Sequence, residues 1–169
     1  MAAIRTLRHV TVLRKKEMVI MFQTSAAIVI HRPIGEVFRF ATDLSNIPLW
    51  VRGAQIRLLS PGPFGEGTRF EETLMRFGRA VTSVVEVKNY QVNERLDFQT
   101  IKAPFPLLSA IGGLRFAATA DGTQVTLTHR VGLVPWLRPL EPLLQRLSQA
   151  QSQRAVQAMK TTFEEGSAR

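Results

Sequence analysis

The sequence predicts a single α+β domain in which a curved, seven-stranded antiparallel sheet wraps a long C-terminal helix. Three observations lead to this prediction. Short strand patterns follow one another along residues 22–134, and Gly, Pro, Asn and Asp residues separate them. Two short helical patterns interrupt this series directly after the first strand. The tail over residues 140–163 instead repeats apolar side chains at helical spacing.

The first strand is expected over residues 22–31, because β-branched residues accumulate toward its end. Pro33 ends it, since proline cannot donate to a sheet ladder. A short helix should follow, with Val37, Phe40 and Ala41 on one face. Asp43 is then expected to cap a second short helix that runs from Leu44 to Trp50, because its carboxylate can accept from exposed amides.

Six further strands are expected, joined as consecutive hairpins, which is typical of an antiparallel meander. They cover residues 54–59, 68–77, 80–88, 95–101, 114–120 and 124–134. Asp121-Gly122 favours a type I′ turn, in which both central residues have positive φ. The apolar segment 103–113 is interpreted as a loop at the mouth of the domain.

The C-terminal helix is predicted to begin among three prolines and to end before Gly166, because proline is tolerated only near the first turn. Its expected buried face comprises Leu140, Leu143, Leu144, Leu147, Ala150, Gln151, Ala155, Ala158, Met159, Thr162 and Phe163. Polar residues fill the opposite side, namely Arg146, Gln149, Gln153, Gln157 and Lys160.

Composition excludes several classes of protein. The chain has 169 residues, of which 45% are hydrophobic and 21% charged, and this suits one globular domain. No window approaches the roughly 18 apolar residues that span a bilayer. The absence of cysteine excludes disulfides, thiol catalysis and cysteine-bound zinc. The three histidines lack metal-ligand spacing, so the sequence predicts neither a metal nor another cofactor.

The net charge of +9 is concentrated near the N-terminus. Five bases precede the first acid, Glu17. No dense basic run with aromatic residues follows, so nucleic acid is not an expected partner. Residues 1–20 are interpreted as a basic extension, either disordered or preceding a true start at Met18 or Met21, with a targeting or membrane-surface tail as the alternative. Residues 21–166 then form the domain, and the lack of a secretory signal favours a cytoplasmic location.

The segment IVIHRPIGEVFRFATDLSNIPLW, residues 28–50, resembles the START-like superfamily, also called SRPBCC. The matching features are Pro33, the triplet Glu36-Val37-Phe38, the pair Thr42-Asp43, and Trp50, with Gly67-Thr68 and Gly122-Thr123 later in the chain. The nearest branch is the bacterial-type polyketide cyclase/dehydrase and lipid-transport-like group. The resemblance implies a helix-grip fold with an apolar ligand pocket. That superfamily includes lipid carriers, hormone receptors, aromatases and cyclases, so the fold does not decide the function.

His129 is the expected acid/base or ligand-binding group of such a pocket. It alternates with Val125, Leu127, Val131 and Leu133, so period two places it on an apolar, inward face. A hydrogen-bonded core histidine is the alternative. The predicted ligand-binding residues are Trp50, Phe70, Glu72, Ser83, Phe98, Phe105, Phe116, Leu127, His129 and Trp136. A solvated Glu72 and plain core packing of the aromatic residues are the corresponding alternatives.

Three functions are compatible with this sequence. The first is binding of a hydrophobic small molecule or lipid between the sheet and the C-terminal helix. The second is a polyketide cyclase, aromatase or dehydratase in which His129 transfers protons. The third is an assembly module that acts through its apolar loop or its basic N-terminus. The loop could cover the pocket, make a peripheral membrane contact, or pack in a homodimer.

Overall fold

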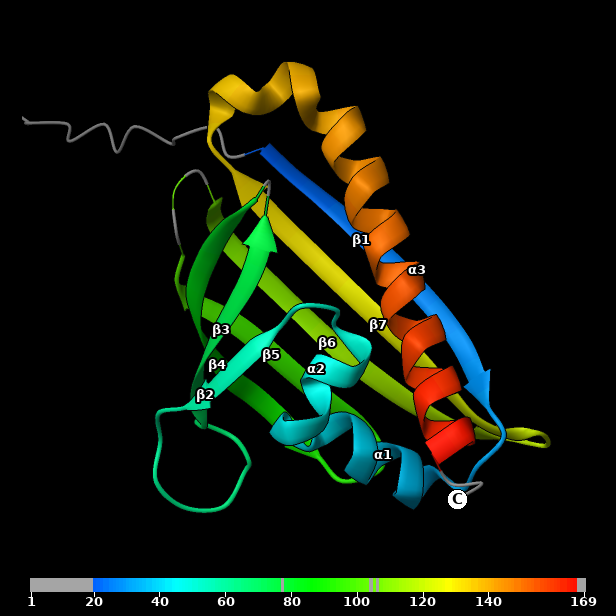
Figure 1. Cartoon of the computed structure of the whole chain (residues 1–169). Helices are drawn as coiled ribbons and strands as arrows, with labels where there is room; N and C mark the ends of the chain where they lie inside the picture. The colour runs from blue at the N-terminus through cyan, green and yellow to red at the C-terminus, as the bar shows by residue number, and fades with distance from the viewer. Residues whose placement is uncertain (1–19, 77, 104, 106, 167–169) are drawn as a thin grey trace, which may run out of the picture.

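A computed structural model describes residues 20–76, 78–103, 105 and 107–166. It confirms the predicted α+β architecture: a seven-stranded antiparallel sheet carries its helices on one face (Figure 1). The elements in chain order are β1 (Ile20–Ile30), α1 (Ile34–Thr42), η1 (Leu44–Asn46), α2 (Ile47–Trp50), β2 (Gln55–Leu58), β3 (Arg69–Arg76), β4 (Arg79–Gln91), β5 (Arg95–Lys102), β6 (Leu107–Thr119), β7 (Gly122–Leu133), η2 (Pro135–Leu140) and α3 (Glu141–Gly166).

The strands are ordered β1-β7-β6-β5-β4-β3-β2, so the first strand lies beside the last. Strands β2 to β7 pair with their sequence neighbours, as a meander requires. β1 closes the sheet against β7 from the Ile20–Leu133 pair to the Ile30–Thr123 pair. α3 packs along β1, and α1 and α2 cover the part of the sheet near the end of β1 (Figure 1).

β6 begins earlier than predicted. Leu107 already pairs with Leu133 of β7, so residues 107–113 are strand and not loop. Gly112 and Gly113 conceal this strand in the sequence, because glycine has low strand propensity. The pairing of β6 with both β5 and β7 overrides that local preference.

The hairpin at Asp121-Gly122 is present, but the expected type I′ turn is wrong. Thr119 pairs with Gly122, so the two loop residues are Ala120 and Asp121. Among the described non-glycine residues, only Asn93 has a positive φ. Gly122 has a φ of 135°, and a Cβ there would lie 2.2 Å from the carbonyl oxygen of Ile30. Glycine is therefore required for close approach to the end of β1.

The short helices follow the predicted pattern. Asp43 Oδ1 accepts a hydrogen bond of 2.9 Å from the backbone amide of Ser45, which confirms the cap between α1 and α2. α1 buries Val37, Ala41 and also Phe38, which is 1% exposed. The ring of Phe38 packs edge-on against Phe116 with 5.1 Å between centroids. This contact anchors α1 on β6.

α3 is rotated relative to the predicted face over its first turns. Its buried residues are Ser152, Ala155, Val156 and Met159. By contrast, the predicted core residues Leu140, Leu143 and Leu147 are 47%, 55% and 52% exposed. A second, small cluster explains why these leucines are exposed. The buried Leu137 packs with Phe22, Leu133 and Val134, and the half-buried Leu144 packs against this cluster, so the start of α3 is held in this orientation. Helical spacing then leaves the other leucines outside.

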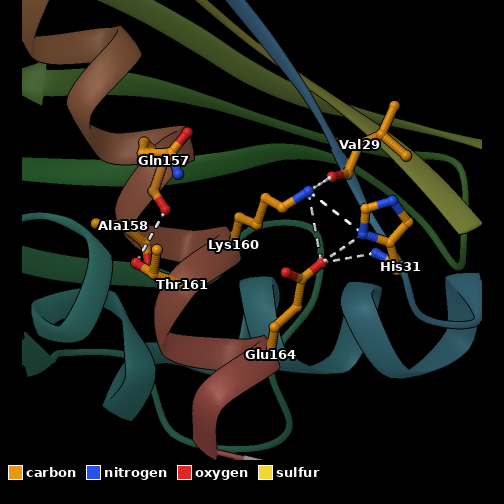
Figure 2. Close-up of polar contacts among 7 residues, drawn as sticks. All are labelled: Val29, His31, Gln157, Ala158, Lys160, Thr161 and Glu164. Carbon is orange, nitrogen blue, oxygen red and sulfur yellow. Dashed lines mark hydrogen bonds and ion pairs between the residues drawn. The ribbon is translucent and has the colours of Figure 1, made fainter.

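The C-terminal part of α3 is fastened to the end of β1 by three polar side chains (Figure 2). Lys160 Nζ donates to the carbonyl oxygen of Val29 at 2.7 Å. Glu164 Oε1 accepts from the backbone amide of His31 at 2.9 Å and lies 3.1 Å from its Nδ1. Partial burial works to raise the pKa of Glu164, but the hydrogen bonds from His31 and the charge of Lys160 outweigh it and hold that pKa below its usual range.

The predicted N-terminal extension lies outside the described residues, apart from Ile20. In the described part of the chain, no helix combines the length and apolar character that crossing a membrane requires.

Candidate functional site

The inner face of the sheet, which faces the helices, is fully buried near α1 and only partly buried at the other end, where the small cluster around Leu137 covers its β1 side. At the end near α1, Val125, Leu127 and Leu114 are at most 1% exposed. Toward the opposite end, inner residues of β3, β4, β5 and β7 are only half-buried. They are Leu74, Val81, Ser83, Phe98, Thr100, His129 and Val131. These inward side chains keep partial contact with solvent, and we call this region the open face.

A row of paired residues crosses the inner face beside this region. Thr24, His129, Gly112, Phe98 and Val87 are consecutive partners on β1, β7, β6, β5 and β4. The rings of Phe98 and His129 meet edge-on with centroids 5.6 Å apart. A Cβ on Gly112 would lie 2.4 Å from Phe98 Cε2 and 2.8 Å from His129 Cδ2. The two rings therefore lie over Gly112, and a Cβ at this position would displace them.

A buried pair of hydroxyl groups lies next to this row. Thr24 Oγ1 and Ser152 Oγ are 3.2 Å apart, and the two residues are 2% and 3% exposed. Each hydroxyl satisfies the other, as buried polar groups require. Sequence reasoning missed both residues. The signal was present, because Thr24 alternates with Phe22 and Ala26, and Ser152 precedes Ala155 by three residues.

Glu72 and Ser83 lie on the inner face of β3 and β4. They are direct partners in the register and share their face with the buried Phe70 and Val85. The neighbouring Glu71 points outward, where its Oε2 accepts a 2.8 Å hydrogen bond from Arg57 Nε. Both inner residues are half-buried. Their role toward a ligand stays a prediction.

The remaining predicted residues fall into two groups. Trp50, Phe70, Phe116 and Leu127 are buried in the main hydrophobic cluster. Phe105 and Trp136 are 75% and 64% exposed at the open end, with their ring centroids 6.4 Å apart. The structure therefore brings His129, Phe98, Glu72 and Ser83 to the open face, places four residues in the core, and leaves two aromatic rings at the rim.

The indole of Trp50 has an unusual environment. Its residue is 7% exposed, and Nε1 is a buried donor without a hydrogen-bond partner in the described part of the chain. Such a donor costs about 1 to 3 kcal/mol when it stays unsatisfied. An acceptor atom of a ligand would remove that cost.

The carboxylates with shifted pKa in the sheet lie on its outer face. Hydrogen bonds from Lys88 and Arg69 hold the pKa of Glu86 below its usual range. Burial works to raise the pKa of Asp97, but hydrogen bonds from Arg95, Arg115 and Asn89 outweigh it, so this pKa is also lowered. These groups stabilise the outer face and are not acid/base candidates for the inner one. No group of three or more metal-binding side chains occurs within the described ranges.

Two surface hollows lie away from the open face. One of about 440 Å³ is lined by Glu36, Arg39, Phe40, Asp43, Asn46 and Phe163. The other, of about 300 Å³, follows α3 along Gln145, Arg146, Gln149, Ala150 and Gln153. Neither includes a residue that the sequence singled out for ligand binding.

Comparison with solved structures finds the same fold in several proteins. A protein from Thermus thermophilus is 20% identical with a TM-score of 0.74, over 86% of this chain and 99% of that one. The Zhui aromatase/cyclase from Streptomyces sp. R1128 is 14% identical with a TM-score of 0.72, over 85% and 94% of the two chains. The di-domain ARO/CYC StfQ from the steffimycin biosynthetic pathway is 14% identical with a TM-score of 0.73, over 88% of this chain and 53% of that one. At such identities the likeness shows a shared fold.

No curated protein matches the chain in sequence. One family does match, over residues 21–164, and it is described as polyketide cyclase/dehydrase and lipid transport. This range begins within β1 and ends near the end of α3, so it covers the whole sheet and its helices. The chain therefore belongs to the polyketide cyclase/dehydrase and lipid transport family.

Proposed function

We propose that this protein binds a hydrophobic small molecule or lipid between the inner face of its sheet and α3, within a domain of residues 21–166. One observation carries the proposal: the inner residues around Phe98 and His129 face the helices but remain half-buried. Well-packed interiors leave few voids. An apolar face that stays accessible, with a few polar groups on it, is the usual form of a small-molecule site.

The polar groups favour a ligand with an apolar body and a hydrogen-bonding head. His129 and the half-buried Ser83 offer donors and acceptors on the sheet, and Trp50 offers an indole N–H from α2. The ring of Phe98 provides an apolar floor between them. A fatty acid, quinone or polyketide-like molecule combines these two features.

A second function, proton transfer in a cyclase, aromatase or dehydratase, is favoured by the position of His129. Imidazole titrates near neutral pH and suits general acid/base catalysis. Its ring lies beside Phe98, where a folded, reactive chain would be held close to it. Under this proposal, His129→Gln abolishes turnover of a polyketide-like substrate while its binding survives.

The first test is native mass spectrometry of the purified protein, followed by organic extraction and titration with an anthroyl-labelled fatty acid. Ser83→Phe is the variant that fills the proposed ligand cleft on the open face, because residue 83 faces inward and is half-buried. Thr82→Phe is its matched control, since Thr82 is exposed on the outer face and bonds Thr73 there at 2.8 Å. We expect the inward substitution to weaken fatty-acid binding about tenfold and the outward one to leave it unchanged.

Equal affinities for the two variants would place the ligand outside the cleft and overturn the proposal. A stoichiometric molecule in the organic extract would name the ligand class. Bound fatty acid that is not displaced by any polyketide-like substrate would favour the binding role over the enzymatic one.

A further inference from the structure

The start of α3 and the preceding η2 carry an exposed apolar stripe. It consists of Trp136, Leu140, Leu143 and Leu147, which recur every three or four residues and are 64%, 47%, 55% and 52% exposed. The stripe is solvent-facing because Leu137, between these residues, is buried in the second core cluster. Helical periodicity normally directs such a stripe into a core, but no element among the described residues covers this one.

Phe105 extends the stripe across the open end of the sheet. It lies on the β5–β6 connection, is 75% exposed, and packs against Trp136 with 6.4 Å between ring centroids. Two large aromatic rings thus stand together at the rim. Trp is enriched where one side of a surface is apolar and the other is wet, as at a membrane interface.

The charges around the stripe are almost all positive. Four segments meet at this end of the sheet: the β3–β4 turn, the β5–β6 connection, η2 and the first turns of α3. They carry the exposed bases Arg79, Lys102, Arg138 and Arg146. Within those segments, Glu141 is the only acid in the described part of the chain. The opposite end of the sheet carries both signs: the acids Glu36, Asp43, Glu66, Glu94, Asp121, Glu164 and Glu165 lie there together with the bases Arg32, Arg39, Arg69, Arg95 and Lys160.

The N-terminal segment joins the fold at the same end. β1 begins at Ile20, which pairs with Leu133 directly before η2. The preceding residues 1–19 carry five bases and one acid. This end of the fold therefore carries the attachment point of a basic segment.

We infer that this end of the molecule docks on the surface of an anionic phospholipid bilayer. Trp136, Phe105 and the leucines enter the acyl boundary, and Arg138 and Arg146 contact the headgroups. Two copies of this chain are a poorer occupant, because face-to-face pairing would bring the same bases together. The inference goes beyond ligand binding, and vesicle binding is measured with no ligand present, so either proposal can fail alone.

The experiment is sedimentation of the full chain with vesicles of phosphatidylcholine, with and without phosphatidylglycerol. Trp136→Ser combined with Leu143→Ser is expected to lower partitioning onto the anionic vesicles at least about tenfold. Val92→Ser is the matched control, since Val92 is also 64% exposed but lies in the β4–β5 turn at the opposite end. It should leave partitioning unchanged.

Charge is tested with a second matched pair. Arg138→Gln should weaken binding several-fold, on the order of the loss expected for one basic residue near an anionic surface. Arg39→Gln, which removes an exposed base from α1, should not. Emission from Trp136 should shift to the blue on vesicle binding, and the shift should be absent in Trp136→Phe.

Four results would overturn the inference. The first two are no sedimentation of the wild-type chain with vesicles at low ionic strength, and equal partitioning onto zwitterionic and anionic vesicles. The third is an equal effect of a test variant and its matched control in either pair. The fourth is a stable dimer that dissociates in the variant that combines Trp136→Ser with Leu143→Ser. The last would assign the stripe to a second copy of this chain.

Discussion

Replacing Gly112 with alanine tests whether two side chains close over a single glycine in the cleft. The added Cβ would lie 2.4 and 2.5 Å from the Phe98 atoms Cε2 and Cζ and 2.8 Å from His129 Cδ2. These are the far ends of side chains, so the rings can move, but only into the open part of the cleft. We therefore expect a folded variant in which the Phe98 ring occupies ligand space.

The size of the effect follows from two opposing contributions. Overpacking of this kind costs about 1 to 3 kcal/mol. Replacing glycine restricts the unfolded chain and returns about 0.4 to 1 kcal/mol. The two ranges leave a net loss between zero and about 2.6 kcal/mol, and the central value of about 1.3 kcal/mol should lower the melting temperature by roughly 3 to 5 °C in a domain of this size. Displacement of the Phe98 ring should weaken fatty-acid binding about tenfold, or about 1.4 kcal/mol.

Calorimetry and fatty-acid titration measure the two effects, and Gly113→Ala separates them. A Cβ at Gly113 would lie 2.5 Å from Asp97 Oδ1 on the outer face, so stability should fall while affinity stays constant. Phe98→Leu should relieve the strain, making the double variant with Gly112→Ala more stable than the sum of the single changes. A Gly112→Ala variant with unchanged melting temperature and unchanged affinity would show that the rings do not close over this glycine.

Three further changes test other parts of the structure. Thr24→Val should cost about 1 to 2 kcal/mol in urea unfolding, because the Ser152 hydroxyl stays buried without its partner, and adding Ser152→Ala should cost less than the sum of both. Glu164→Gln should cost about 1 kcal/mol at neutral pH. Since the pKa of Glu164 is lowered in the folded chain, its contribution to stability is complete above its ordinary pKa of 4.5 and is lost as the pH falls through the lower, folded pKa. The unfolding free energies of the wild-type chain and the variant should therefore converge in acid. A difference that stays constant with pH would contradict the ion pairs of Glu164 with Lys160 and His31. Trp50→Phe removes an unsatisfied donor, so it should change the free energy of unfolding by less than about 1 kcal/mol while weakening fatty-acid binding. Unchanged affinity for the fatty acid would exclude the indole as a ligand contact.

The local patterns of the sequence were reliable where one interaction decides the structure. Period-two alternation placed His129 and Leu127 on one face of β7, and the register agrees, because they pair with Gly112 and Leu114, which are also two positions apart. The Asp43 cap needs only a neighbouring amide, so it too could be predicted locally. The same reasoning failed for residues 107–113, whose strand depends on pairing with β5 and β7 rather than on the propensity of its glycines.

The candidate site was predicted only in part, because the sequence gives the face of a residue but not its depth. Phe116 and Phe98 both point inward, yet Phe116 is buried against Phe38 and Phe98 stays half-buried at the open end. The Thr24–Ser152 pair joins residues 128 positions apart, and no local pattern reports such a contact.

The sequence by itself determined the class of fold, the order of the strands in the meander, the two short helices and the length of the last one. Each follows from hydrophobic periodicity and turn chemistry over a few residues. Only the tertiary structure decided which side of α3 is buried. The leucines at positions 140, 143 and 147 have the spacing of one helix face, but α3 lies along β1 and buries the side that carries Ser152, Ala155 and Met159, while these leucines face solvent. Periodicity defines the faces of a helix, whereas the choice between them depends on which surface the rest of the chain presents.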